Sequence, residues 1–584
     1  MIEPLLWITV PLAPLLFLLL LISFPKALTK LPSWIWVSCV PALVFSLLPP
    51  ATFSPDGLWP GASLGGDHVL LTTWLAMTAV LWAVAGAYAA DSMREGEHLQ
   101  RFWVFWLLAL SGNLLLIISQ DAMSFYVGFS MMSLSAYGLV IHNGTSAARR
   151  AGRLYLQLAV LGEVLLLSGL LMQAHAAQGS FMFIDWVSAP LDPLTALLLI
   201  TGLGLKAGFW PLHVWLPLAH PAAPAPASAV LSGAMIKAGI FGLWMFLPDI
   251  FEPASSAIVD TAESAQASGL SGWSLSDWSQ PAMVIGLISA FFGVVVGLTR
   301  TDAKQVLAYS SVSQMGYLLF ILALSWQLSA QREVLLIVLL VYAVHHGFAK
   351  AALFLSADLL KSGKASGRTQ SFVLIAGLLV PALALCGLIF SSGAAAKAGL
   401  KDVLENAGLV YWLPWLQIGA MTSTLLLARA SYLLFRLQSK APSQAIPRQR
   451  FVLWASLSMM PVLLPWLWMP MNEALLKTLA IYKIVELSWP VVLGISVAGF
   501  VIWRGWQVPH FLTRMTNPFL LYSIHFTRRS KKALLPAFEF NLPTAPLRSI
   551  ERRWNRYWQG GTVNRSAALL LIFMVVAAVF MLIA

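Results

Sequence analysis

The sequence predicts an all-α polytopic membrane protein with about 16 transmembrane helices. Only 10% of its 584 residues are charged and 59% are hydrophobic, and the mean hydropathy is +0.78. Apolar runs of about 20 residues, the length that crosses roughly 30 Å of hydrocarbon, recur along the chain. Because a backbone in lipid must satisfy its own hydrogen bonds, each run is expected to be a helix.

The expected spans follow one another along the whole chain. The first run is too long for a removable signal peptide and lacks a cationic start and a small-residue cleavage site, so it is expected to be retained. The spans are predicted near residues 4–24, 31–48, 68–90, 103–120, 122–142, 154–174, 190–212, 225–248, 281–299, 305–326, 333–357, 371–396, 409–435, 451–470, 485–503 and 566–584.

The loops between these spans differ in charge. Most of the 36 Lys and Arg residues fall in the odd-numbered loops, which the positive-inside rule assigns to the cytoplasm. The long loop 249–280 has no Lys or Arg and is expected on the outer side. We therefore expect a multi-pass protein of a bacterial inner (plasma) membrane with both termini on the periplasmic side. The net charge of +12 is then a sign of topology and not of nucleic-acid binding.

The segment 504–565 is strongly basic and contains Trp554 and Trp558. Cations and tryptophans together are typical of a segment that lies at the lipid headgroups. We expect a cytoplasmic interfacial segment, with a brace along neighbouring subunits as the alternative.

The sequence offers no site for a metal or cofactor. Cys39 and Cys386 lie far apart inside apolar runs, which is typical of buried small hydrophobic residues. No Cys, His and acid cluster has zinc or iron–sulfur spacing, and no phosphate-binding glycine motif joins a strand to a helix. No cofactor and no covalent chemistry are therefore expected on this chain, although it could be a subunit of an oxidoreductase.

Two lysines accompany a predicted break between the seventh and eighth spans. Lys206 lies shortly before Pro211, which removes an amide donor and should interrupt the helix, and Lys237 lies midway along the next span. A charge at this depth costs at least about 2.5–3.5 kcal/mol, and irregular backbone is tolerated there only in a wet cavity or packed in protein. Both lysines are therefore expected to be functional.

Further candidates lie in the second half of the chain. His346 and Lys350 are four residues apart in "YAVHHGFAKAALF" and share one helix face. Lys397 follows Gly393, in a region where Pro381 and nearby small residues predict another interruption. The chain thus presents a row of groups that could exchange protons: Lys206, Lys237, His346, Lys350 and Lys397.

Each candidate also has a structural interpretation. Lys397 could extend to the membrane interface, and Lys350 could form a structural pair. One member of the pair His345 and His346 could be only packed or bonded to backbone. The possible accessory residues His213 and His220 could simply satisfy carbonyls that the broken helix frees.

Three stretches resemble the antiporter-like subunits of the respiratory complex I superfamily. They are "KAGFWPLHVWLPLAHPAAPAPASAVLSGAMIKAGIFGLW", "TDAKQVLAYSSVSQMGYLLF" and "HHGFAKAALFLSADLL". The superfamily includes complex I, Mrp cation/proton antiporters and energy-converting membrane hydrogenases, and the resemblance covers roughly residues 68–435. It implies two inverted five-helix repeats, each a half-channel with a discontinuous helix. The implied divisions are N-terminal helices 1–102, repeats 103–248 and 281–435, outer loop 249–280, C-terminal helices 436–503, interfacial segment 504–565 and final helix 566–584.

The resemblance also assigns roles to the candidate residues. Lys206 is similar to the central lysine of the first half-channel, and Lys237 to the connecting lysine of the following helix. His346 and Lys350 match the motif of the eleventh helix. Lys397 matches the terminal group of the second half-channel.

One position departs from the family pattern. The family usually has a glutamate in the fifth helix that pairs with the central lysine, but here "FSMMSL" has Ser130 in its place. Glu163 in the sixth span is the nearby acid that lies deep in a helix. We expect Glu163 to replace the missing partner, with another polar contact as the alternative. Without a substitute, the first half-channel would be altered or inactive.

The expected function is that of a proton-translocating subunit in a multisubunit membrane complex. Its partners would be a redox module, Mrp-type subunits, or a soluble zinc protein that uses proton flow for inorganic-carbon uptake. A stand-alone cation/proton antiporter and a membrane anchor with a decayed channel are the alternatives. Protons are favoured over Na⁺, because Na⁺ prefers carboxylate and carbonyl oxygens, which are scarce in these spans.

Overall fold

The computed structural model describes residues 6–505, except for residues 25–29, 50, 56–58, 60, 67–68, 95, 97 and 248–274. The predicted final helix 566–584, nearly all of the interfacial segment 504–565 and most of the loop 249–280 lie outside the described residues. In the described part, 12 helices are long and apolar enough to cross a membrane. The chain is a multi-pass helical membrane protein.

The described elements include helices within each of the first fifteen predicted spans, but only 12 of the described helices are long and apolar enough to cross a membrane, and the predicted number of 16 spans stays a prediction. In chain order they are η1 (Leu6–Ile8), α2 (Thr9–Ser23), η3 (Leu31–Cys39), α3 (Val40–Phe45), β1 (Ala51–Phe53), β2 (Leu64–Gly66), α4 (Val69–Ser92), α5 (Leu99–Ile118), α6 (Ala122–Val140), α7 (Ser146–Ala176), α8 (Phe183–Trp186), α9 (Pro193–Ala207), α10 (Leu216–Ala222), α11 (Ala225–Val230), η4 (Leu231–Met235), α12 (Lys237–Phe246), η5 (Leu275–Trp278), α14 (Ser279–Leu298), α15 (Ala303–Gln327), η6 (Ser329–Gln331), α16 (Arg332–Ser362), α17 (Gly367–Cys386), α18 (Ser392–Asn406), η7 (Val410–Trp412), α19 (Leu413–Ser439), α20 (Arg448–Leu467), α21 (Met469–Thr478) and α22 (Ile481–Trp503).

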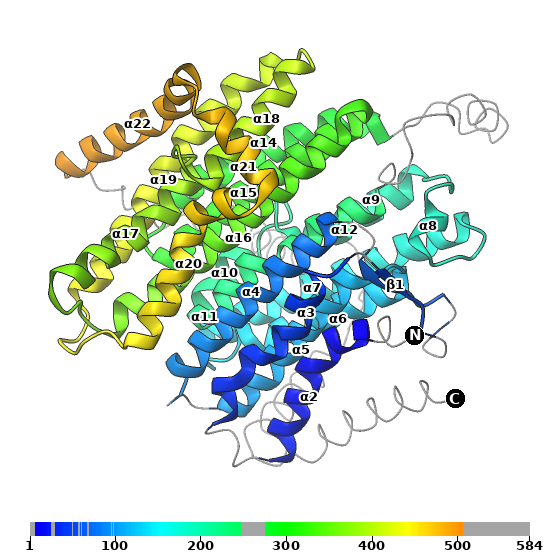
Figure 1. Cartoon of the computed structure of the whole chain (residues 1–584), viewed down its shortest axis with the longest axis horizontal. Coiled ribbons are helices and arrows are strands. Elements are labelled where there is room, and N and C mark those ends of the chain that lie inside the picture. The colour runs from blue at the N-terminus through cyan, green and yellow to red at the C-terminus, as the bar shows by residue number, and fades with distance from the viewer. Residues whose placement is uncertain are drawn as a thin grey trace, which may run out of the picture.

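The two halves of the chain lie side by side with their helices running in a similar direction (Figure 1). Helix α16 contacts α4 and α11 of the first half and α15, α17, α18, α19 and α20 of the second. Most of α16 is buried, because it lies between the two halves. Strands β1 and β2 form a small antiparallel pair in which Thr52 faces Gly65.

Both predicted interruptions are present, but each begins a few residues from the expected position. Helix α9 ends at Ala207, four residues before Pro211. The next residue, Gly208, adopts a left-handed conformation (φ +72°). Helix α17 ends at Cys386 with Gly387 at φ +91°, and α18 begins at Ser392. Glycine adopts such left-handed conformations without strain and commonly ends a helix. The expected span 371–396 is therefore divided into two helices at Gly387.

The expected span 225–248 is irregular in its middle. It consists of α11, the π-helical turn η4 and α12, and Lys237 is the first residue of α12. A π turn contains one extra residue per turn and is frequent at functional sites. The short helix α21, between the last two described spans, was not predicted from the sequence.

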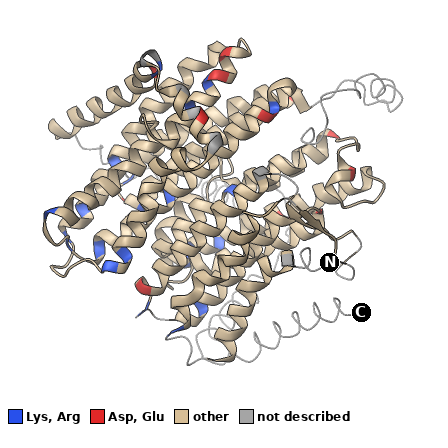
Figure 2. Ribbon diagram, in the orientation of Figure 1, with Lys and Arg blue, Asp and Glu red and all other residues tan. Residues whose placement is uncertain are grey.

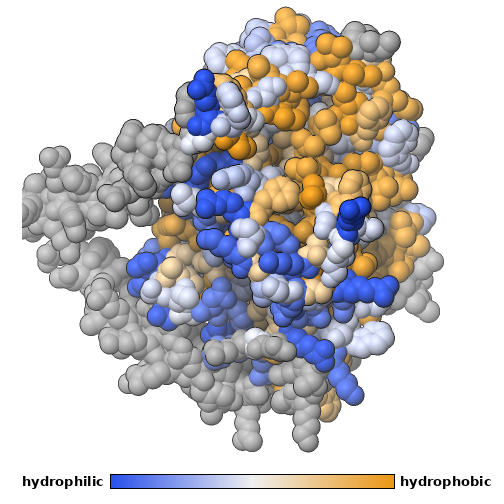
Figure 3. Space-filling view, turned by 90° about the vertical axis from the view of Figure 1, so that its left-hand side faces the viewer, coloured by the Kyte–Doolittle hydropathy of each residue, from blue (hydrophilic) through white to orange (hydrophobic). Residues whose placement is uncertain are grey.

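Charged residues are distributed unevenly between the two ends of the helices. Lys and Arg gather toward the lower left of the molecule, and Asp and Glu lie mostly toward the upper right (Figure 2). Seen from that left-hand side, hydrophilic residues gather in the middle of the face, beside hydrophobic surface above and to the right (Figure 3). An excess of Lys and Arg at one end of the helices is the pattern from which the positive-inside rule assigns the cytoplasmic side. The assignment of this face to the cytoplasm stays a prediction.

Candidate functional site

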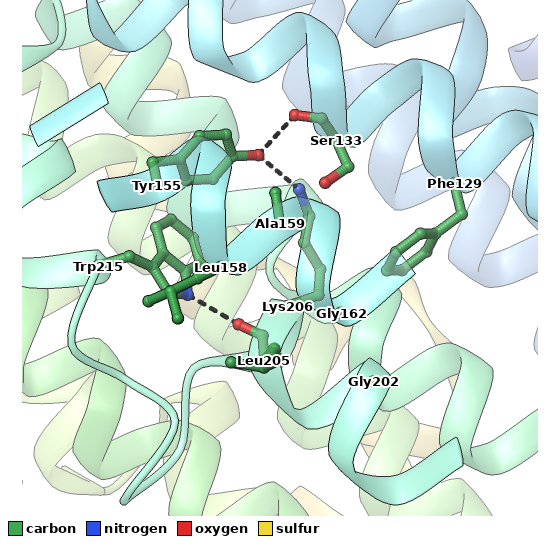
Figure 4. Close-up of a pocket in the computed structure, with 10 residues that line it drawn as sticks. All are labelled: Phe129, Ser133, Tyr155, Leu158, Ala159, Gly162, Gly202, Leu205, Lys206 and Trp215. Atoms are coloured by element: carbon green, nitrogen blue, oxygen red, sulfur yellow. Dashed lines mark hydrogen bonds between the residues drawn. The ribbon is translucent and has the colours of Figure 1, made fainter. Parts of the chain in front are cut away.

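Lys206 lies in the last turn of α9, directly before the break, and only 5% of the residue is exposed. Its ammonium donates a hydrogen bond to the Tyr155 hydroxyl at 3.1 Å, and that hydroxyl donates to the Ser133 carbonyl oxygen at 2.7 Å. Figure 4 shows the tyrosine oxygen between the other two groups. Helices α6, α7 and α9 thus meet at one lysine.

A small cavity adjoins this lysine. Its volume is about 10 Å³, and its lining includes Lys206, Tyr155 and Trp215 (Figure 4). A space of about 10–15 Å³ is the minimum that one water molecule needs. The arrangement therefore has room for one polar molecule beside the ammonium.

Glu163 approaches the same site from α7. It is 6% exposed, so it does not face lipid, and it is a charged neighbour of Lys206 and lies beside the hydroxyls of Ser130 and Ser133. Its Oε1 atom and the Ser130 Oγ atom have no hydrogen-bond partner among the described residues. The carboxylate thus lies next to the serine that occupies the family's acidic position. The assignment of Glu163 as its substitute stays a proposal.

The carbonyls freed by the break are satisfied mostly by groups that the sequence did not single out. Trp215 donates its indole N–H to the Leu205 oxygen at 2.7 Å. Lys304 donates to the carbonyl oxygens of His220 and Ala223. The alternative that the imidazoles of His213 and His220 satisfy these carbonyls is wrong, because their ring nitrogens have no partner in the described structure.

The two histidines are instead packed against aromatic rings. The His213 ring lies 4.8 Å from that of Phe292, and the His220 ring stacks on Phe354 at 4.3 Å. Both histidines are completely buried. Buried polar groups normally have a protein or water partner, so these rings mark positions where water is expected to reach the interior.

Lys237 is completely buried at the end of the π turn. Its ammonium donates to the carbonyl oxygens of Ser232 at 3.0 Å and Gly233 at 2.7 Å. The Ser232 hydroxyl lies 2.8 Å from that of Ser311 on α15. The lysine therefore supplies a donor to carbonyls within the irregular turn.

His346 and Lys350 lie on α16 next to this turn. Lys350 donates to the Leu307 carbonyl oxygen at 2.8 Å and to the Ser310 hydroxyl, while neither ring nitrogen of His346 has a partner among the described residues. His345 differs, because its Nδ1 atom lies 2.7 Å from the Ser392 hydroxyl at the start of α18. Of the two histidines, His345 is thus the one with a polar contact.

Lys397 extends back across the second break. Its ammonium donates to the carbonyl oxygen of Cys386, the last residue of α17. It also lines a pocket of about 70 Å³ together with Tyr317, Tyr342 and Glu486. The alternative that Lys397 extends to the membrane interface is not what the structure shows, because the ammonium turns inward to this carbonyl.

The structure gives the candidate residues an order in space. Lys237 is an electrostatic neighbour of His345, His346 and Lys350, and His345 is also a neighbour of Lys397. Lys206 has Glu163 as its charged neighbour instead. The central group of Lys237, the histidine pair and Lys350 therefore continues toward Lys397, while Lys206 and Glu163 form a separate group.

Several polar residues of this interior were not predicted. Tyr155, Ser310 and Ser392 each contact a candidate residue, and Ser311 contacts Ser232, whose carbonyl accepts from Lys237. Tyr155 lies on the same helix as the predicted Glu163, so a search of the sixth span for all polar residues would have found it. In the described residues, no three His, Cys, Asp or Glu side chains lie close enough together to hold a metal ion.

Comparison with known proteins places this polar interior within one family. The family model described as NADH:quinone oxidoreductase/Mrp antiporter, TM, matches residues 119–418, which is just over half of the chain. The chain belongs to this family. The match spans α6 to α19 and includes every candidate residue from Ser130 to Lys397.

Curated relatives of this antiporter family are similar over part of their length. Hydrogenase-4 component B of Escherichia coli is 32% identical over 323 residues, which are 53% of this chain and 45% of the relative. NADH-quinone oxidoreductase subunit N of Pelobacter propionicus is 26% identical over 269 residues, which are 45% of this chain and 52% of the relative. The chain thus spans about half the length of these relatives.

Solved structures share the fold. A chain of the Mrp complex from Dietzia sp. has a TM-score of 0.63 at 19% identity, with 85% of this chain and 100% of that chain covered. A chain of the membrane-bound sulfane sulfur reductase, an archaeal respiratory membrane complex, has a TM-score of 0.62 at 19% identity, with 84% and 99% covered. The protein is an antiporter-like membrane subunit, homologous to components of complex I, hydrogenase and Mrp assemblies.

Proposed function

We propose that this chain translocates protons as one subunit of a multisubunit complex in a bacterial inner membrane. One observation carries the proposal. Lys206, Lys237 and Lys350 are buried, Lys397 turns inward to the Cys386 carbonyl oxygen, and none of the four has a carboxylate within 4.0 Å among the residues that the structure describes. Ionisable groups buried among membrane helices mark ion pathways and proton relays.

The path would run through groups that donate and accept protons. The carbonyl and hydroxyl contacts of the lysines and the unpartnered rings of His213, His220 and His346 supply polar positions between them. Water at those rings would carry protons from one lysine to the next. Lys206 and Lys237 would act in the first half, His346 and Lys350 would connect the halves, and Lys397 would load or release the proton.

Protons suit this interior better than Na⁺. Na⁺ requires several oxygen ligands, and hard cations are normally bound by carboxylates and carbonyls together. Apart from the carboxylate of Glu163, the side chains gathered here are amines, imidazoles and hydroxyls. We therefore propose H⁺ as the transported ion, and an assay in which a sodium gradient replaces the potassium diffusion potential checks this choice.

The test uses the full chain reconstituted into liposomes, first alone and then with the proteins that co-purify with it. A potassium diffusion potential drives proton uptake, and a pH-sensitive dye reports it. We expect Lys206→Ala and Lys397→Ala each to reduce uptake at least tenfold, on the order of 1.4 kcal/mol in barrier height. Arg150→Ala changes an exposed cation outside the pathway and should leave uptake unchanged.

Two outcomes would contradict the proposal. Uptake that is equal in the wild type and both lysine variants, with assembly intact, would favour a membrane anchor with a decayed channel. Full activity of the chain alone, unchanged by its partners, would favour a stand-alone antiporter. Recovery of a soluble zinc protein or of a redox module among the co-purifying proteins would distinguish inorganic-carbon uptake from an electron-transfer complex.

A further inference from the structure

A basic pocket lies apart from the proposed proton pathway, where three helices end at one membrane face. It has a volume of about 230 Å³ and is formed by the start of α15, the end of α16 and the end of α19. Its lining contains four cations and one acid: Lys304, Lys361, Arg436, Lys440 and Asp302. We call these residues, with the apolar Leu433 and Leu437 beside them, the basic pocket.

The acid of the basic pocket is already engaged. The Asp302 carboxylate accepts the backbone N–H of Gln305 at 2.9 Å and so caps the first turn of α15. Another carboxylate near Lys304, that of Asp358, accepts the Tyr88 hydroxyl at 2.9 Å. Lys361, Arg436 and Lys440 have no carboxylate within 4.0 Å in the described structure. The pocket therefore keeps an excess of positive charge.

The walls of the basic pocket are part polar and part apolar. Leu433 and Leu437 lie one turn apart on α19 and line the pocket together with the cations. Tyr432 on the same helix is 42% exposed, and the Arg436 guanidinium lies 5.9 Å from its ring centre. Tyrosine and arginine beside leucine are typical of the level at which lipid headgroups meet acyl chains.

We propose that the basic pocket binds the phosphate of an anionic phospholipid headgroup, with the glycerol and acyl chains lying along Leu433 and Leu437. Phosphate oxygens accept hydrogen bonds from several Lys and Arg side chains at once, and Arg can bind them in bidentate fashion. Basic pockets between transmembrane helices on the cytoplasmic side are suited to such headgroups. A free phosphate ion would use the same cations but would leave the apolar wall unused.

The basic pocket also touches the first broken helix. Lys304 donates to the carbonyl oxygens of His220 and Ala223, which lie at the junction of α10 and α11. A phosphate bound beside Lys304 would compete with these carbonyls for its ammonium. Lipid binding is thereby connected with the conformation of this junction, although the binding proposal does not depend on proton transport.

The experiment measures lipid binding by the full chain in neutral detergent after removal of endogenous lipid. Native mass spectrometry counts bound phosphatidylglycerol or phosphatidylethanolamine, and intrinsic fluorescence follows thermal unfolding with each lipid or with inorganic phosphate. The pocket variant is Lys361→Gln, Arg436→Gln and Lys440→Gln together. The matched control is Arg149→Gln, Arg150→Gln and Arg153→Gln, which removes three exposed arginines from α7.

We expect wild type and control to bind phosphatidylglycerol at least tenfold more tightly than the pocket variant, because each lost cation weakens binding severalfold. Stabilisation by phosphatidylglycerol alone assigns the site to lipid, and stabilisation by inorganic phosphate that is lost in the pocket variant assigns it to free phosphate. Equal binding by wild type and pocket variant, or equal binding of both lipids, overturns the proposal. If the triple variant does not fold, the single variant Lys440→Gln is used, and it should bind phosphatidylglycerol more weakly than the wild type. Added salt should also weaken binding by the wild type, because it screens the cations.

Discussion

The Lys206 ammonium and the Tyr155 hydroxyl oxygen lie 3.1 Å apart, and this contact joins the end of the broken helix α9 to the middle of the bundle. The hydroxyl donates its own hydrogen bond to the Ser133 carbonyl oxygen at 2.7 Å. The lysine is therefore held by a neutral oxygen, while its charged neighbour Glu163 acts through space. This arrangement leaves the ammonium without a permanent ion pair in the described structure, as a group that must gain and lose a proton requires.

Replacement of Tyr155 by Phe tests this contact. The variant keeps the ring but removes the one oxygen that, among the described residues, accepts a hydrogen bond from the Lys206 ammonium. We expect a loss of about 1 kcal/mol in stability, the usual net value of one hydrogen bond, and a clear fall in proton uptake by liposomes. Unchanged uptake in a stable Tyr155→Phe variant would show that the proton path does not depend on this hydroxyl.

The role of Glu163 can be tested by moving the acid. Glu163→Gln should reduce proton uptake roughly tenfold, on the order of 1.4 kcal/mol, because it removes the carboxylate beside Lys206. Adding Ser130→Glu to this variant returns an acid to the position where the family usually has it, and should restore uptake. Failure of the double variant to recover, with normal assembly, would argue that Glu163 has another polar role.

Gly393 allows α18 to start close to α17. A Cβ atom at this position would lie 1.8 Å from the Ala384 carbonyl oxygen and 3.0 Å from the His345 Nε2 atom. Gly393→Ala should therefore destabilise the protein by about 1–3 kcal/mol or more and displace Lys397. The matched control is Gly399→Ala in the same helix, where the added atom would meet only a Val338 methyl group at 3.0 Å. Thermal unfolding of both variants checks the expectation.

Two ion pairs attach α22 to α18 beside the pocket that Lys397 lines. Lys483 lies 2.6 Å from Asp402, and Lys401 contacts Glu486. Asp402→Asn with Glu486→Gln should lower stability by about 1 kcal/mol or less, since these pairs are partly exposed, and should speed hydrogen exchange in α22. Glu405→Gln is the control, because Glu405 pairs with Lys401 within α18 itself.

The predicted orientation can be tested on α7. Ser146 and His175 lie 29 positions apart on this helix, a length of about 44 Å at 1.5 Å per residue, which exceeds the roughly 30 Å hydrocarbon layer. Cys39 and Cys386 are buried and should react little. A membrane-impermeant maleimide applied to spheroplasts should label His175→Cys and spare Ser146→Cys. The reverse pattern would place the basic face outside.

The fold could be predicted well where hydrophobicity decides it. The apolar runs located the described spans because lipid requires long stretches of hydrogen-bonded backbone. Pro211 and the small residues near Gly393 predicted the two interruptions, but the helices end a few residues earlier, where Gly208 and Gly387 adopt left-handed conformations. The π turn before Lys237 contacts α16 and has two carbonyls bonded by the lysine, and it was not predicted from the sequence.

The site was predicted less completely, for a physical reason. Lysines and histidines stand out in an apolar span because their burial is costly, whereas serine and tyrosine are common there and carry no such signal. Tyr155, Ser311 and Lys304 gain their importance only from neighbours distant in sequence. Spatial order could not be predicted either, because it depends on how the two halves pack around α16.

The π turn of residues 231–235 has a consequence for every study of Lys237. The amine donates hydrogen bonds to the Ser232 and Gly233 carbonyl oxygens of the irregular turn. Lys237 therefore has a structural role in addition to its proposed role in proton transfer. Truncating it would remove the donor of two buried carbonyl oxygens, at a cost of about 1–3 kcal/mol for each that stays unsatisfied. Loss of proton transport in a Lys237→Ala variant would therefore not show whether the charge or the hydrogen bonds had been needed. A replacement that retains a hydrogen-bond donor, such as Lys237→Arg, can separate the two roles.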